Sequence, residues 1–124
     1  MKQLIFFVVR FMPLIFSCCI VAITVITIIP NTTLPNALIF WDKAQHVLAF
    51  AALSLTGSLA FPNNTKIVYI GLILYGIWIE VIQKYLTTTR VGDALDLLAN
   101  SAGIIIGIII YLLVRKLIQH QIKE

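Results

Sequence analysis

The chain has 124 residues, of which 60% are hydrophobic and only 11% are charged. A typical soluble domain is about 25% charged, and a chain this short cannot hide so much apolar surface inside a folded core. These values exclude a soluble globular domain and predict an integral membrane protein in which residues 1–124 form a single domain. The net charge of +4 then reflects membrane topology, because cytoplasmic loops collect Lys and Arg, and we expect no nucleic-acid partner.

Four apolar segments have the composition of membrane-spanning helices. A spanning helix needs about 20 mostly apolar residues, because the hydrocarbon core of a bilayer is about 30 Å thick. Turn-forming Pro, Asn, Thr and Gly residues separate the segments. The first segment is too long for the apolar part of a signal peptide, so we expect it to be a retained helix. The predicted fold is an all-α bundle of four transmembrane helices at about residues 4–29, 42–61, 67–86 and 93–114.

The basic residues predict the orientation of this bundle. An even number of spans places both termini on the same side of the membrane. That side collects six basic residues and the other side three, so both termini are expected in the cytoplasm. The six are Lys2, Arg10, Lys66, Arg115, Lys116 and Lys123, and the three are Lys43, Lys84 and Arg90.

Most of the remaining polar residues gather at the opposite, extracytoplasmic end. They open the second helix, close the third and lead into the fourth, and the predicted topology brings these three places to one side of the membrane. Helical spacing directs several of them to common faces: Asp42 and His46 are four residues apart, and Asp96 and Asn100 continue a stripe that begins at Asp93. The set comprises Asp42, Lys43, His46, Glu80, Gln83, Lys84, Arg90, Asp93, Asp96 and Asn100.

Ionisable residues within a membrane are costly, at about 2.5–3.5 kcal/mol near a helix centre, and their presence indicates function. A simpler interpretation is that polar side chains only hold neighbouring helices together by hydrogen bonds. In that interpretation, Asp42 and Asp93 cap helix N-termini. Lys43 and Lys84 extend their ammonium groups to the membrane surface. The residues for which we favour function are His46, Glu80, Asp96 and Asn100.

Three kinds of chemistry fit these residues. His46 and Glu80 have the side chains of a general acid and base. Arg90 can bind a phosphate or carboxylate through two hydrogen bonds, with Lys43 and Lys84 as further cations. Carboxylates and imidazole also ligate divalent cations, but no dense motif such as His-Glu-x-x-His occurs, so we expect neither a metal site nor a cofactor. The sequence also has no glycine-rich phosphate loop and no activated serine or cysteine.

Three blocks of residues resemble, in order and spacing, the VanZ-like family of small bacterial membrane proteins, named after an accessory factor in resistance to the glycopeptide teicoplanin. The blocks are Asp42-Lys43-x-x-His46-x-x-x-Phe50, then Glu80-x-x-Gln83, then Arg90-x-x-Asp93-x-x-Asp96-x-x-x-Asn100-x-x-Gly103-x-x-x-Gly107. They cover residues 42–107, three of the four predicted helices. At Phe50, family members often carry an aromatic residue with a hydroxyl group. The resemblance implies action on, or near, lipid-linked envelope precursors at the outer face of the bacterial cytoplasmic membrane.

These observations lead to three hypotheses. In the first, the outer polar residues bind an anionic lipid-linked or peptidoglycan-related ligand; the site would consist of His46 and Glu80 with the ligand-binding residues Asp42, Lys43, Gln83, Arg90, Asp93, Asp96 and Asn100. The second is a membrane-embedded hydrolase or transferase that uses His46 and Glu80 as acid and base. The third is a scaffold or assembly subunit, indicated only by Gly103 and Gly107, whose spacing allows two membrane helices to approach closely. Transport is the least expected function, because the polar residues do not continue to the cytoplasmic end. The identity of the ligand and the oligomeric state stay open.

Overall fold

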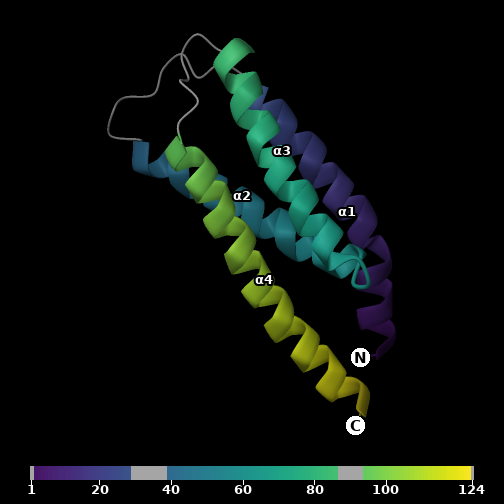
Figure 1. Ribbon diagram of the computed structural model, residues 1–124. Coiled ribbons are helices and arrows are strands. Elements are labelled where there is room, and N and C mark those ends of the chain that lie inside the picture. The colour runs from purple at the N-terminus through teal and green to yellow at the C-terminus, as the bar shows by residue number, and fades with distance from the viewer. Residues whose placement is uncertain (1, 29–38, 87–93, 124) are drawn as a thin grey trace.

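The computed structural model describes residues 2–28, 39–86 and 94–123, and these residues form four α-helices (Figure 1). They are α1 Lys2–Ile28, α2 Ile39–Ala60, α3 Thr65–Leu86 and α4 Ala94–Lys123. The prediction of an all-helical chain is therefore confirmed. In Figure 1, the N and C ends lie toward one end of the molecule, whereas α2 begins, α3 ends and α4 begins toward the other.

The helix limits agree with the predicted ones to within three residues, except at the end of α4. α4 continues to Lys123 rather than ending near residue 114. Its last nine residues contain no Gly or Pro, so nothing in the backbone stops the helix where the apolar stretch ends. α2 begins at Ile39, so Asp42 lies inside its first turn and is not the N-cap residue that we considered.

Apolar side chains cover the outside of the bundle, the reverse of a soluble protein. Phe7, Ile26, Ile67 and Leu98 are each more than 60% exposed. Among the described residues, three helices are long and apolar enough to cross a membrane: Phe7–Thr27 in α1, Thr65–Leu86 in α3 and Ala94–His120 in α4. α2 has 22 residues but is more polar, and a fourth span remains a prediction.

α2 packs against each of the other three helices, most extensively against α4. The buried apolar core consists of Phe50, Leu53, Leu72, Ile79 and Ile104, from α2, α3 and α4. The polar side chains of α2 form hydrogen bonds within this core. Ser54 donates to the backbone carbonyl of Ile104 at 3.0 Å, and Ser58 is 2.9 Å from the hydroxyl of Tyr69. Satisfied hydrogen bonds of this kind allow polar side chains inside an apolar bundle.

Gly103 and Gly107 lie on the face of α4 that contacts α2. A Cβ atom at Gly107 would lie 2.5 Å from Ser54 Cβ and 2.6 Å from the carbonyl oxygen of Ala51, and one at Gly103 would overlap the carbonyl oxygen of Val47. Only glycine therefore permits this approach between the two helices. Because α2 of the same chain already covers this face, the two glycines no longer indicate a separate partner protein.

A hydrogen-bonded group joins α1 to α3. The hydroxyl groups of Thr24 and Tyr75 are 2.7 Å apart, and Tyr75 also donates to the carbonyl of Ile20 at 3.2 Å. The Tyr75 ring packs on Phe50, with ring centroids 5.9 Å apart. These contacts connect α1 to the core of the other three helices.

Candidate functional site: a polar cluster where α2 and α4 begin

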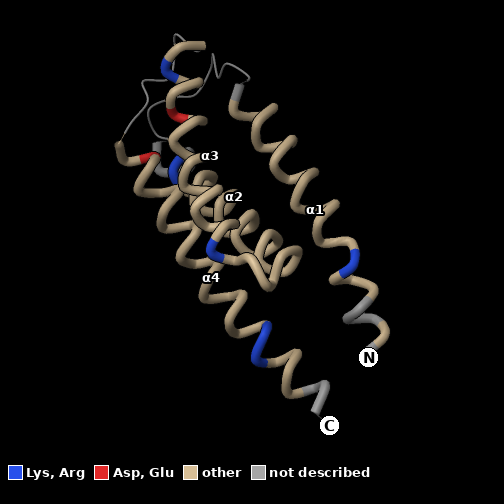
Figure 2. The backbone as a smooth tube through the Cα atoms, turned by 45° about the vertical axis from the view of Figure 1, so that its right-hand side comes forward, with Lys and Arg blue, Asp and Glu red and all other residues tan. Residues whose placement is uncertain are grey.

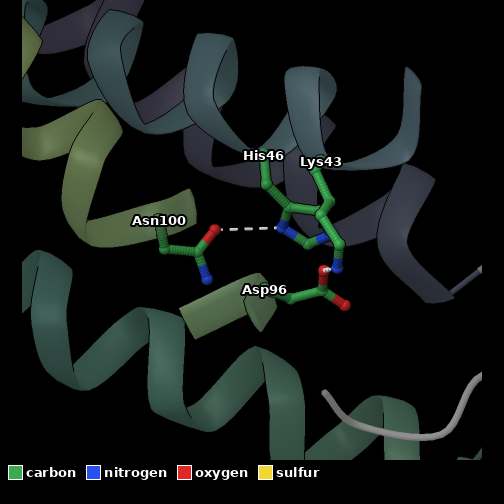
Figure 3. Close-up of polar contacts among 4 residues, drawn as sticks. All are labelled: Lys43, His46, Asp96 and Asn100. Atoms are coloured by element: carbon green, nitrogen blue, oxygen red, sulfur yellow. Dashed lines mark hydrogen bonds and ion pairs between the residues drawn. The ribbon is translucent and has the colours of Figure 1, made fainter. Parts of the chain in front are cut away.

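Two side-chain pairs join the beginning of α2 to the beginning of α4 (Figure 3). The Lys43 ammonium donates to Asp96 Oδ1 at 2.8 Å, and the ring nitrogen Nδ1 of His46 is 2.9 Å from Asn100 Oδ1. Lys43 and His46 are three residues apart and Asp96 and Asn100 are four apart, so each helix presents its pair on one face. The two faces meet, and the pairs stack one turn apart.

These pairs are withdrawn from the surface to different degrees. Asn100 is 1% exposed and Asp96 is 7% exposed, whereas the side chain of Lys43 is 28% exposed. Lys43 is therefore the more exposed member of its ion pair. It balances a carboxylate that would otherwise be a costly unpaired charge in an apolar environment.

The bond to Asn100 determines the tautomer of a neutral His46. The amide oxygen of Asn100 can only accept, so Nδ1 of His46 carries the hydrogen and donates it. The second ring nitrogen, Nε2, then keeps its lone pair. In Figure 3, the ring lies between Asn100 and the Lys43–Asp96 pair.

α3 adds Glu80 to this arrangement. Both oxygen atoms of its carboxylate are buried. One ligand-type atom from each of His46, Glu80 and Asp96 lies within 4.8 Å of the other two. We refer to Lys43, His46, Glu80, Asp96 and Asn100 as the polar cluster. Three helices supply it, and it combines two carboxylates, an ammonium, an imidazole and an amide.

Apolar residues close the cluster on the side of the bundle core. Phe50 follows His46 by one helical turn and is 1% exposed. Gly76 makes room for the Asn100 amide, because a Cβ atom there would lie 3.3 Å from Asn100 Nδ2. That amide nitrogen is buried and has no hydrogen-bond partner among the described residues. Sequence reasoning did not identify Gly76 as part of the site, although its position four residues before Glu80 places it on the same helix face.

The other predicted site residues have different positions. Gln83 is 1% exposed on α3, one turn from Glu80, whereas Lys84 is exposed. Asp42 belongs to α2, but its side chain lies outside the described residues, as do Arg90 and Asp93 altogether. In Figure 2, the acidic residues that are coloured lie toward the end where α4 begins, while basic residues occur at both ends.

The structure is an apolar four-helix bundle with a cluster of ionisable side chains at one end, which is the form of a helical membrane protein. Ionisable residues inside such a protein indicate function, so the polar cluster is the candidate site. The model of the VanZ/LLP1 family matches residues 3–115. The chain belongs to this family, which confirms the resemblance seen in its sequence blocks. No curated protein and no solved structure matches the chain.

Proposed function

We propose that this VanZ/LLP1 family protein spans the bacterial cytoplasmic membrane four times and binds the anionic headgroup of a lipid-linked cell-envelope precursor. Both termini lie in the cytoplasm and the polar cluster faces the outer side. The observation that carries the proposal is the convergence of Lys43, His46, Glu80, Asp96 and Asn100 from three helices. Structural hydrogen bonds alone do not require two carboxylates at one place in an apolar bundle, because each buried charge is costly.

The outer location is supported by the distribution of charge. Short cytoplasmic loops collect Lys and Arg, and six of the nine basic residues belong to the end opposite the polar cluster in the four-span arrangement. A lipid anchored in the outer leaflet would reach the cluster along the membrane without having to enter water. The proposed ligand-binding set also contains Gln83, which is buried on α3 one turn from Glu80, and Asp42, Arg90 and Asp93, which we include from their positions in the sequence.

The proposal is tested in cells that lack the native protein and express variants at equal levels. His46→Gln, Glu80→Gln and Asp96→Asn each remove a charge or a ring nitrogen while preserving size. We expect all three to lose the growth advantage that the parent gives under agents that inhibit envelope synthesis. His120→Gln removes the other histidine of the chain, far along α4, and should behave like the parent. If all three cluster variants also behave like the parent, the cluster is structural and the proposal fails.

A second function is favoured by one specific observation, the proximity of His46 to Glu80 within the 4.8 Å group. An imidazole with an available lone pair beside a buried carboxylate can move a proton during hydrolysis or group transfer. Purified parent protein incubated with a panel of lipid-linked envelope precursors should then form a product that mass spectrometry detects and that Glu80→Gln does not form. Lack of product with every precursor would leave binding as the function.

A further inference from the structure

The charge of the polar cluster conflicts with a purely anionic ligand. Glu80 and Asp96 contribute two negative charges and Lys43 one positive charge, so the cluster has a formal charge of −1. A phosphate or carboxylate headgroup would therefore meet net repulsion from these five residues, and repulsion between like charges is strong in an environment of low dielectric constant. A divalent cation would change the formal charge to +1 and remove the conflict.

The structure supplies suitable ligand atoms for such a cation. One ligand-type atom each of His46, Glu80 and Asp96 lies within 4.8 Å of the others. Zinc ligands at about 2.1 Å in tetrahedral geometry are about 3.4 Å apart, so no pair of these atoms has to close by more than about 1.4 Å to bind an ion. Three protein ligands leave a further coordination position, as in zinc sites that bind a substrate or water.

The surroundings of His46 have the features of a metal-binding histidine. Histidine ligands almost always donate their second ring N–H to a carboxylate or a carbonyl oxygen, which fixes the tautomer and the ring orientation. Here His46 Nδ1 donates to the Asn100 oxygen at 2.9 Å, and Nε2 is left for the ion. Asn100 is itself 1% exposed, and its amide nitrogen, next to Gly76, has no hydrogen-bond partner among the described residues. This buried donor is available to an oxygen atom of a ligand that enters the site.

We propose that His46 Nε2, Glu80 and Asp96 bind a divalent transition-metal ion of the Zn²⁺ or Mn²⁺ type, and that this ion binds the anionic headgroup. The mixture of one imidazole and two carboxylates selects this class, because imidazole favours transition metals and carboxylates also suit Mn²⁺. The inference rests on the proposed function and specifies how its site attracts an anion. Lys43 holds Asp96 Oδ1 and competes with the ion for that carboxylate.

Metal binding is measured on the full chain in lipid nanodiscs, after treatment with a chelator and then with Zn²⁺ or Mn²⁺. We expect the parent to bind one ion per chain by elemental mass spectrometry. His46→Gln, Glu80→Gln and Asp96→Asn should each weaken binding by about tenfold or more, and Asn100→Ala by about tenfold, the effect typical of a residue that orients a ligand. His120→Gln, which removes the other histidine, should bind like the parent. Lys43→Met should bind the ion more tightly, because it removes the competing ammonium.

A spectroscopic measurement separates a lost ligand from a misfolded variant. With Mn²⁺ bound, pulsed electron paramagnetic resonance should detect coupling to a histidine nitrogen in the parent and in His120→Gln, and no such coupling in His46→Gln. Absence of ion binding in the parent, or equal binding in all three ligand variants, would overturn the inference.

The link to the headgroup is measured by retention of anionic lipid with and without the chelator. Loss of retention on chelation supports the inference. Retention that persists in a parent that binds no metal overturns the metal site but keeps the proposed function. Retention that is the same with and without a bound ion overturns the role of the ion as a bridge. If neither metal nor anionic lipid is bound, both proposals fail.

Discussion

The close approach of α4 to α2 depends on two glycines, and the effect of replacing them can be worked out from the contacts. In Gly107→Ala, the new Cβ would lie 2.5 Å from Ser54 Cβ, whereas ordinary contacts begin at 3.4 Å. The helices must therefore separate by about 1 Å at this level, which also stretches the 3.0 Å hydrogen bond from Ser54 to Ile104. Overpacking costs about 1–3 kcal/mol, and a hydrogen bond between membrane helices contributes about 0.6 kcal/mol. We expect Gly107→Ala to reduce the free energy of unfolding by about 2–4 kcal/mol, and Gly103→Ala by a similar amount.

Gly71→Ala provides the matched control for this prediction. Nothing lies within 4 Å of a Cβ at Gly71, and alanine is favoured over glycine in a helix by up to about 1 kcal/mol. The control should be neutral or slightly stabilising. The free energy of unfolding is measured by titration with a denaturing detergent in mixed micelles, followed by circular dichroism. If Gly107→Ala and Gly71→Ala unfold at the same detergent fraction, the close contact between α2 and α4 is not present in the membrane.

Three further changes test other contacts by the same unfolding measurement. Tyr75→Phe removes the hydroxyl that joins α3 to α1 and should lower the free energy of unfolding by about 0.6 kcal/mol. Tyr85→Phe is the control, because that side chain is 79% exposed, and it should leave the free energy of unfolding unchanged. Equal effects of the two changes would contradict the contact between α1 and α3. Ser54→Ala should cost a similar 0.6 kcal/mol, because it removes a donor to the α4 backbone, and an unchanged stability would show that this bond contributes nothing. Lys43→Met leaves the buried Asp96 carboxylate without this cation and should lower the free energy of unfolding by about 1–3 kcal/mol. Lys84→Met, at an exposed side chain, should leave it unchanged. A larger loss of stability in Lys84→Met than in Lys43→Met would refute the ion pair.

The number of helices and some of their shared faces could be predicted from the sequence, because they follow from composition and helical spacing. The apolar segments predicted four helices. The spacing of Asp96 and Asn100 predicted a shared face on the fourth helix, and the structure turns that face toward α2. The length of α4 was predicted too short, because the prediction ended the helix where the apolar stretch ends. A helix without Gly or Pro continues past that point.

The composition of the polar cluster was harder to predict from the sequence. His46, Glu80 and Asp96 belong to three helices, and their mutual distance depends on how deep each helix sits in the bundle. That depth is set by close packing at positions such as Gly103 and Gly107, which spacing within one helix does not reveal. No two of these three residues are neighbours in the chain, so the sequence contains no dense metal-binding motif that would have brought them together. The roles of Asp42, Arg90 and Asp93 remain predictions, because their side chains lie outside the described residues.

The central claim is that the polar cluster binds an anionic lipid headgroup, and the lipids that remain with the protein test it most directly. The parent, His46→Gln, Asp96→Asn and His120→Gln are extracted from bacterial membranes in native-lipid discs, and their lipids are compared by mass spectrometry with those of the whole membrane. We predict that one anionic lipid-linked species is enriched with the parent and with His120→Gln, and that this enrichment is lost in the two cluster variants. A lipid composition equal to that of the membrane in all four samples would contradict the claim.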